Sequence, residues 1–340
     1  MVASVDLSPP TSLAGNGSSL SIVVASGLLV QGNQGCSGVL LGSSWWVAAA
    51  AESLARLGPA LAQSQVAWGA SVYVAQSLFD SNVAPQFLGA AGLTLLGTGP
   101  TTLRDCSFTA NTIPGTGDPA VPSQPWADPT PYGYVGSGAG VYVEQVGSSL
   151  EVVGTWDSER QQSSCSFTGS KVPGGCGAML LLGANQTVAI EGCAIHNNPS
   201  SCNLLMVDDA SSAGNSRLVM RDCHVTGNYG GNGISIPQQG VGSSFGVVPP
   251  VTTAAVAFTV IKDCLFSNNM FGAMYAIGTT SNTNEIVIDN CVIEDNQTNQ
   301  AQSYVDAQVF IMLFSRVTTQ HTIIRRNLLL TDAGWGFPLW

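Results

Sequence analysis

Two stretches of the chain decide the fold: Thr259-Val-Ile-Lys-Asp-Cys264-Leu-Phe266-Ser-Asn-Asn269 and Ile286-Val-Ile-Asp-Asn-Cys291-Val-Ile293-Glu-Asp-Asn296. In both, apolar residues alternate with others up to an Asp or Asn, and this alternation is typical of a β-strand. The Asp or Asn then favours a bend, because its short polar side chain bonds locally to the backbone. After the bend, the Cys and the apolar residue two positions later point inward, and the final Asn forms the next turn. Each stretch therefore predicts two short strands joined by a bend.

The same pattern recurs along the chain. Four more segments have a Cys, an apolar residue two positions later and a small polar residue five positions later: Cys106-Ser-Phe108-Thr-Ala-Asn111, Cys165-Ser-Phe167-Thr-Gly-Ser170, Cys193-Ala-Ile195-His-Asn-Asn198 and Cys223-His-Val225-Thr-Gly-Asn228. Three degenerate copies lack the cysteine: Leu28-Leu-Val30-Gln-Gly-Asn33, Ser77-Leu-Phe79-Asp-Ser-Asn82 and Asn327-Leu-Leu329-Leu-Thr-Asp332. Four of the eight intervals between anchors are 27 to 30 residues, which is one structural repeat, and the longer ones are expected to carry insertions or a hidden unit.

Repeats of short strands can bury their apolar faces only by stacking on one another, so the chain is predicted to be a solenoid. A leucine-rich repeat would show Leu-x-x-Leu-x-Leu and a returning helix, and neither is present. A β-sandwich would not share one register over so many units. We therefore predict an all-β fold, a parallel β-helix of about nine to eleven coils with stacked strands about 4.8 Å apart.

These repeats resemble those of the right-handed parallel β-helix repeat superfamily. The Phe-x-x-Asn copies at Phe79, Phe108 and Phe266, with Gly174-Gly-Cys-Gly-Ala178 and Gly138-Ala-Gly-Val141, are similar to repeats of chlamydial polymorphic outer-membrane proteins and algal surface β-helix proteins. The resemblance covers roughly Ser21 to Asp332 and implies right-handed winding. It says little about activity, because the superfamily includes pectin-degrading enzymes, phage tailspikes and adhesins.

Composition restricts the classes of function. Charged residues are 9% of the 340 residues, against roughly 25% in soluble domains. Ten Lys and Arg against 21 Asp and Glu give a net charge of −11, so a surface for nucleic acid is not expected. No apolar run of about 18 residues predicts a membrane span, and residues 1–10 lack the pattern of a signal peptide.

The predicted organisation is an extended segment at residues 1–17 and a single β-helix domain at residues 18–340. Loop insertions are expected near residues 44–64, 111–138 and 237–252, where Pro, Gly or Ala interrupt the repeat. Within the first of these, the Ala-rich stretch from Trp45 to Leu57 predicts a short helix. Loops that project from a rigid scaffold are the usual place for binding surfaces.

Nine cysteines fall into two registers. The six at the repeat anchor, Cys106, Cys165, Cys193, Cys223, Cys264 and Cys291, are predicted to form a ladder of buried free thiols. Their spacing of about 4.8 Å exceeds the Cβ separation of a disulfide, which is about 3.5 to 4.5 Å. Cys36, Cys176 and Cys202 lie in a different register, and Cys176 with Cys202 is the predicted disulfide. No Cys-x-x-Cys is present, so a zinc site is not expected.

Other polar residues suggest surfaces rather than an active site. His196 and His224 are predicted to face outward on neighbouring coils, as a solvated surface or half of a weak metal site, and His321 has no acidic partner nearby in sequence. Mixed charges beside the anchors predict a stripe up one edge: Arg104, Arg221, Lys262, Arg325 and Arg326 with Asp105, Asp222, Asp263 and Asp289. The acids without a neutralising neighbour in this scheme are Asp208, Asp209, Glu294, Asp295 and Asp306. Glycosylation sequons occur at Asn16, Asn185 and Asn296.

We expect a non-enzymatic structural or adhesive module of the extracellular space or cell surface, such as a rigid spacer, a filament subunit or a matrix component. No catalytic residue, cofactor or metal is predicted. The expected partners are other surface or matrix proteins, glycans, or further copies joined end to end. The alternative is a carbohydrate-active enzyme, similar to polysaccharide lyases or hydrolases, or a saccharide-binding β-helix that uses a lateral groove.

Overall fold

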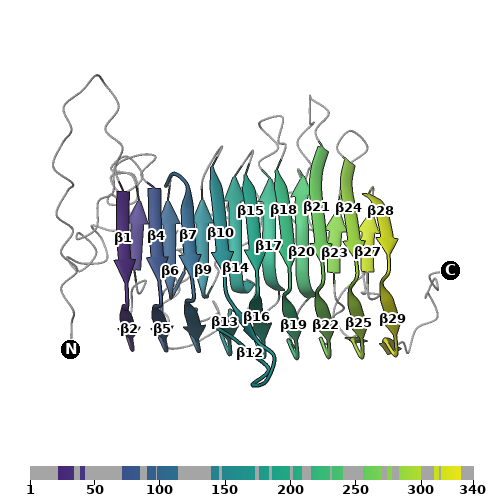
Figure 1. Cartoon of the computed structure of the whole chain (residues 1–340), viewed down its shortest axis with the longest axis horizontal. Coiled ribbons are helices and arrows are strands. Elements are labelled where there is room, and N and C mark those ends of the chain that lie inside the picture. Colours follow the sequence, from purple (N-terminus) through teal and green to yellow (C-terminus); the bar gives the residue numbers. More distant parts are fainter. Residues whose placement is uncertain are drawn as a thin grey trace, which may run out of the picture.

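The computed structural model is a stack of parallel β-strands (Figure 1). It describes residues 22–33, 39–42, 71–84, 90–96, 98–113, 139–144, 148–172, 176–183, 186–199, 202–208, 216–229, 232–239, 256–269, 274–277, 283–299, 310–313 and 315–330. Within these ranges no helix is present, and so none with the length and apolar character to span a membrane. The segment 1–17, the predicted helix, the insertion at 44–64 and most of those at 111–138 and 237–252 lie outside them.

Three sheets run the length of the stack. The first contains β1 (Ile22–Ser26), β4 (Ser71–Ala75), β7 (Thr101–Arg104), β10 (Ser149–Val153), β15 (Thr187–Glu191), β18 (Arg217–Arg221), β21 (Val256–Lys262), β24 (Thr283–Asp289) and β28 (Ser315–Gln320), in that order. The second contains β2 (Leu29–Gln31), β5 (Leu78–Asp80), β8 (Ser107–Thr109), β13 (Cys165–Thr168), β16 (Cys193–His196), β19 (His224–Thr226), β22 (Leu265–Ser267), β25 (Val292–Glu294) and β29 (Ile323–Arg325). The third contains β3 (Val39–Gly42), β6 (Leu93–Leu96), β9 (Val141–Glu144), β14 (Cys176–Gly183), β17 (Cys202–Asp208), β20 (Asn232–Gln239), β23 (Met274–Ile277) and β27 (Phe310–Leu313).

Neighbours in each sheet are parallel and come from successive repeats, as expected for a parallel β-helix-like solenoid. Two small sheets add to the stack. An antiparallel pair joins β11 (Trp156–Asp157) to β12 (Gln162–Ser163), and a parallel pair joins β26 (Gln297–Asn299) to β30 (Leu328–Leu330).

Each bend between the first and second sheets contains a residue with left-handed backbone. Asp105, Asp222 and Asp263 have φ of 54°, 50° and 54°, and Gly192 takes the same place with φ of 61°. Asp, Asn and Gly tolerate this conformation better than other residues, because glycine has no Cβ and the short polar chains bond locally. The left-handed backbone before most anchors is therefore a feature of the bend that Asp, Asn or Gly meets at most rungs and that Gln76 and His321 also adopt.

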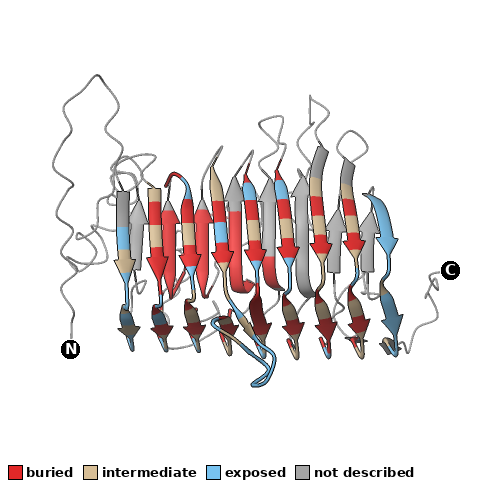
Figure 2. Cartoon of the chain, viewed as in Figure 1, coloured by how far each residue is buried: buried red, intermediate tan, exposed pale blue. Residues whose placement is uncertain are grey.

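The alternation seen in the sequence produces the core. In β18, Leu218 and Met220 are buried while Arg217 and Arg221 are exposed, and Figure 2 shows the same banding along the sheets. Inward residues of successive rungs stack directly. The rings of Phe79 and Phe108 are 4.7 Å apart at their centroids, and those of Phe108 and Phe167 are 4.9 Å apart.

A column of asparagine side chains closes the rungs at the second turn. Nδ2 of Asn228 donates to Oδ1 of Asn269 at 2.9 Å and to the backbone carbonyl of Ile195 at 3.0 Å. Oδ1 of Asn228 accepts from both the backbone N–H and Nδ2 of Asn198, at 3.1 Å each. The side-chain links join Asn33, Asn82 and Asn111, and then Asn198, Asn228, Asn269, Asn296 and Asn327. We call this column the asparagine ladder.

The register of the last repeat differs from the prediction. We predicted an anchor at Asn327, but β29 pairs with β25 so that Ile323 is opposite Val292, and Thr322 is the anchor beside Cys291. Asn327 is instead the ladder residue of this rung. The sequence Thr322-Ile-Ile-Arg-Arg-Asn327 therefore follows the repeat pattern with threonine in place of cysteine.

Removing one ladder amide should weaken the whole stack. Asn228→Ala leaves two donors of Asn198 and the carbonyl of Ile195 without their buried partner, so we expect the free energy of unfolding to fall by about 2 to 4 kcal/mol. Urea unfolding followed by circular dichroism measures this change. The control is Thr226→Ala, a half-buried side chain on the same rung, and an equal loss in both variants would contradict a special role for the ladder.

The ladder is interrupted at Ser170, which suggests a stabilising substitution. Ser170 is buried between Asn111 and Asn198, and its backbone N–H donates to Oδ1 of Asn198 at 2.9 Å. Serine carries no amide to join its neighbours in the ladder. Ser170→Asn should supply this link and raise the free energy of unfolding by about 1 kcal/mol. A lower melting temperature than that of the parent chain would show that the pocket cannot hold the larger side chain.

Candidate functional site

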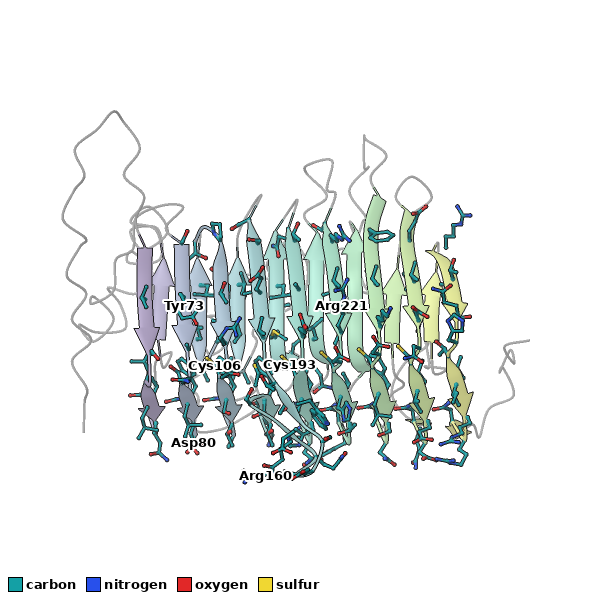
Figure 3. All side chains as sticks on the ribbon, in the orientation of Figure 1. Tyr73, Asp80, Cys106, Arg160, Cys193 and Arg221 are labelled. Carbon is teal, nitrogen blue, oxygen red and sulfur yellow. The ribbon has the colours of Figure 1, made fainter. Side chains whose placement is uncertain are left out.

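The anchor cysteines form a structural column at the bend between the first and second sheets (Figure 3). All six are free and buried. The thiols of Cys193 and Cys223 donate to the carbonyls of the residues two positions earlier, at 3.2 Å and 3.0 Å. The hydroxyls of Ser77 and Thr322 make the same bond in other rungs, at 2.7 Å and 2.9 Å. In these rungs the bend holds a small side chain with one donor, supplied by cysteine, serine or threonine.

Cys106 and Cys193 behave chemically as packing groups. Burial raises the pKa of Cys106 to about 11. The pKa of Cys193 is also raised, by the adjacent thiols of Cys165 and Cys223 and by burial. A protonated buried thiol is a poor nucleophile and a poor metal ligand. In the described ranges no group of three or more His, Cys, Asp or Glu side chains is placed to hold a metal ion.

The second cysteine register lies in the third sheet. Cys176 is buried and disulfide-bonded. The pairing of β14 with β17 places Cys202 opposite Cys176, so a bond between these two stays our prediction. Cys36 lies outside the described residues.

An antiparallel hairpin, β11 and β12, projects from the stack between β10 and β13, with Arg160 near its tip (Figure 3). The hydroxyl of Ser163 donates to the carbonyl of Gly192, and that of Ser164 donates to Oδ1 of Asp105 at 2.5 Å. These bonds fix the base of the hairpin on two rungs. Sequence analysis missed this element, although the long interval between Cys106 and Cys165 was a signal that an insertion was present.

The hairpin covers part of the outer face of the second sheet. The ring of Trp156 lies on that of His224, with centroids 3.7 Å apart and planes inclined by 40°. On the neighbouring rung, Nε2 of His196 is 2.8 Å from the hydroxyl of Thr168. Burial lowers the pKa of both His196 and His224, which favours neutral imidazoles. We call Trp156, His196 and His224 the hairpin patch.

The charged stripe at the end of the first sheet contains one paired cluster, around Asp289. The strand register places Arg221, Lys262 and Asp289 side by side on successive rungs. Nζ of Lys262 is 3.6 Å from Asp289, and Nδ1 of His321 is 3.0 Å from the same carboxylate. The hydrogen bond with His321 is the main cause that lowers the pKa of Asp289. His321 thus has an acidic partner, one rung away, that its sequence neighbourhood does not show.

The acids predicted to lack a neutralising neighbour are neutralised where the structure describes them. Arg326 contacts Glu294 at 2.7 Å and Asp295 at 2.8 Å, and Arg325 contacts Glu294 at 2.7 Å. Arg325 ends the strand β29 and Arg326 follows it, so neither precedes an anchor and their predicted place in the stripe was wrong. Asp209, Asp306 and the side chain of Asp208 lie outside the described residues.

The sequon at Asn296 lies inside the asparagine ladder. Its side chain is fully buried, and Nδ2 donates to Oδ1 of Asn327 and to the carbonyl of Phe266, both at 3.0 Å. A glycan on this nitrogen is incompatible with the folded rung, which corrects the expectation from the sequon. Asn16 and Asn185 lie outside the described residues.

The fold and these surfaces define a parallel β-helix-like solenoid on whose exterior some charged groups are paired between rungs. Comparisons with models of protein families, with curated proteins and with solved structures found no match for the chain. Its function must therefore be inferred from its own residues.

The hairpin patch makes a prediction about pH. Because Trp156 covers His224, Trp156→Ala should raise the pKa of His224 toward the ordinary value of about 6.5. Because the pKa of His224 is lower in the folded state than in the unfolded state, the packing of Trp156 on His224 stabilises the fold above about pH 6.5. This stabilisation is lost as the pH falls through the folded pKa. An NMR titration of the imidazole measures both effects. Tyr73→Ala, on β4, is the control, and an unchanged His224 titration in Trp156→Ala would contradict the assignment.

Proposed function

We propose that this chain is a non-enzymatic structural or adhesive module of the extracellular space or the cell surface, which acts as a rigid spacer, filament or matrix component. The asparagine ladder carries this proposal. Its buried amides donate to and accept from the rungs on either side, so these polar groups are committed to holding the stack. An active site would instead need polar groups aimed at a ligand.

The rungs support the rigidity that a spacer needs. Nine strands at about 4.8 Å give a stack of about 38 Å for the first sheet. Each rung is joined to the next by backbone ladders, by stacked core side chains and by side-chain amides. Bending the stack would have to break several of these contacts at once.

We further propose that the solenoid is a right-handed parallel β-helix of nine to eleven coils, related to the surface proteins whose repeats it resembles, with a short helical insertion. The proposed location agrees with the bonded state of Cys176, because disulfides persist mainly in oxidising compartments. Other surface or matrix proteins and glycans are the proposed partners.

Activity and shape together test the structural role. The purified chain is incubated with acidic and neutral polysaccharides, with and without calcium, and new reducing ends and unsaturated products are measured. We expect no turnover, and small-angle scattering should fit a stiff rod. Turnover that scales with protein concentration and survives repurification would contradict the proposal.

A second candidate is a saccharide-binding module, and the hairpin patch favours it. The Trp156 ring, which lies on His224, offers aromatic area on which a sugar could stack. Retention on immobilised glycans discriminates the two, with Trp156→Ala as the test variant and Tyr73→Ala as the matched control. Binding lost only in Trp156→Ala would favour an adhesive role through glycans, whereas no retention of the parent chain would leave the spacer role.

A further inference from the structure

We infer that the two ends of the solenoid bind each other head to tail, so that the partner of this chain is a second copy of itself. This inference rests on the proposed structural function, because it names the way in which such a module would extend into a filament. It starts from the edge strands β1 and β2 at one end and β28 and β29 at the other, the first and last of their sheets in the described part of the chain.

The first and last rungs are in the same register. The pairings place Val317 at the same register position as Val23, and Ile324 at the same position as Val30. The spacing from these strands to the closing asparagine is also the same, so residues 316–327 match residues 22–33 one for one. A second copy placed after the last rung would therefore continue both sheets without an insertion or a slip.

The asparagine ladder ends with complementary groups. Asn327 uses one Nδ2 proton for the carbonyl of Ile293 at 3.0 Å. Asn296, one rung earlier, donates its other Nδ2 proton to the next asparagine, so the same geometry would aim the second proton of Asn327 beyond the last rung. At the other end, Asn33 donates to Asn82, and its Oδ1 has no donor among the described residues. Head-to-tail contact would bring the donor of Asn327 to the acceptor of Asn33. Two identical ends would meet donor to donor or acceptor to acceptor.

The exposed apolar surface lies at the same two ends. Of the seven large apolar side chains that are exposed in the described ranges, five belong to the terminal strands: Val24 (62%), Leu29 (61%), Val317 (38%), Ile323 (50%) and Ile324 (49%). Ile323 and Leu29 share one outward column, and Ile324 and Val30 share one inward column, so in the second sheet apolar residues would meet apolar residues. In the first sheet the register places Val24 opposite Thr318. An unpaired strand edge with such side chains is a template for pairing with another chain.

Charge does not oppose this contact. Arg325 and Arg326 on the last rung are neutralised by Glu294 and Asp295 of the rung before. The first rung, residues 22–33, contains no charged residue. The contact joins two different surfaces of the chain, so it is heterologous and would give an open filament rather than a closed dimer.

Two charged substitutions test the polarity of the contact. Leu29→Glu and Ile323→Lys change outward, exposed side chains at opposite ends, so they should not disturb the core. Sedimentation velocity and negative-stain microscopy over a concentration series measure assembly, and circular dichroism checks the fold. We expect the parent chain to form linear filaments, and each single variant to raise the dissociation constant at least about tenfold, the equivalent of about 1.4 kcal/mol. Tyr229→Glu, an exposed side chain in the middle of the stack, is the matched control.

Mixing the two variants gives the decisive result. In the mixture, Lys at one end meets Glu at the other, and the remaining ends are unchanged, so filaments should return. A parent chain that stays monomeric at every concentration would overturn the inference, and so would assembly blocked by only one of the two substitutions. A stiff monomer without polysaccharide turnover would leave the proposed structural role intact, whereas turnover would contradict that role whatever the state of assembly.

Discussion

The structure depends on the need to satisfy a buried amide from two neighbouring rungs. Asn228 has two donors and two acceptor positions, and all four are used only when the rungs before and after it are in register. A single buried polar group left without a partner costs about 1 to 3 kcal/mol, so a slip of one residue would be penalised at every rung. Because this constraint acts between neighbouring rungs, it also explains why the chain tolerates insertions between one rung and the next. The Phe108 and Phe167 rings are 4.9 Å apart although Cys106 and Cys165 are separated by a long insertion, while Phe79 and Phe108, in repeats of ordinary length, are 4.7 Å apart.

Much of this fold could be predicted from the sequence because the repeat encodes local requirements. Alternation gives the strands, and the Asp, Asn or Gly before most of the anchor cysteines gives the left-handed bend. The last repeat was misplaced because Thr322 lacks the thiol that marks the other anchors and Leu328 to Leu330 look like an apolar strand of the pattern. Contacts between side chains on different rungs could not be predicted from the sequence either. Arg326 and Asp295 are far apart in the chain, and they become neighbours only when the register of β29 against β25 is known.

The thiol column illustrates the difference between a recurring residue and a functional one. Cys193, Ser77 and Thr322 make the same hydrogen bond to the carbonyl two positions earlier, so the repeat selects a small donor at the bend rather than sulfur chemistry. A buried, protonated thiol is protected from oxidation by the same burial that raises its pKa. The column can therefore coexist with a disulfide-bonded Cys176 in one chain and one compartment, because the two registers differ in geometry and not in redox environment.

Specificity in such a molecule must come from the outward columns and from insertions, because the inward ones are occupied by stacking. The outward column of the second sheet changes from Leu78 to Ser107 and Ser166, and then to Ala194 and His224, while the inward column keeps Phe, Ile or Val. The first titratable ring in this outward column is that of His224. The hairpin folds over the column at this residue, where Trp156 contacts His224. A repeat whose inward residues are similar in every rung and whose outward residues differ between rungs can thus carry a binding surface without any change to its core.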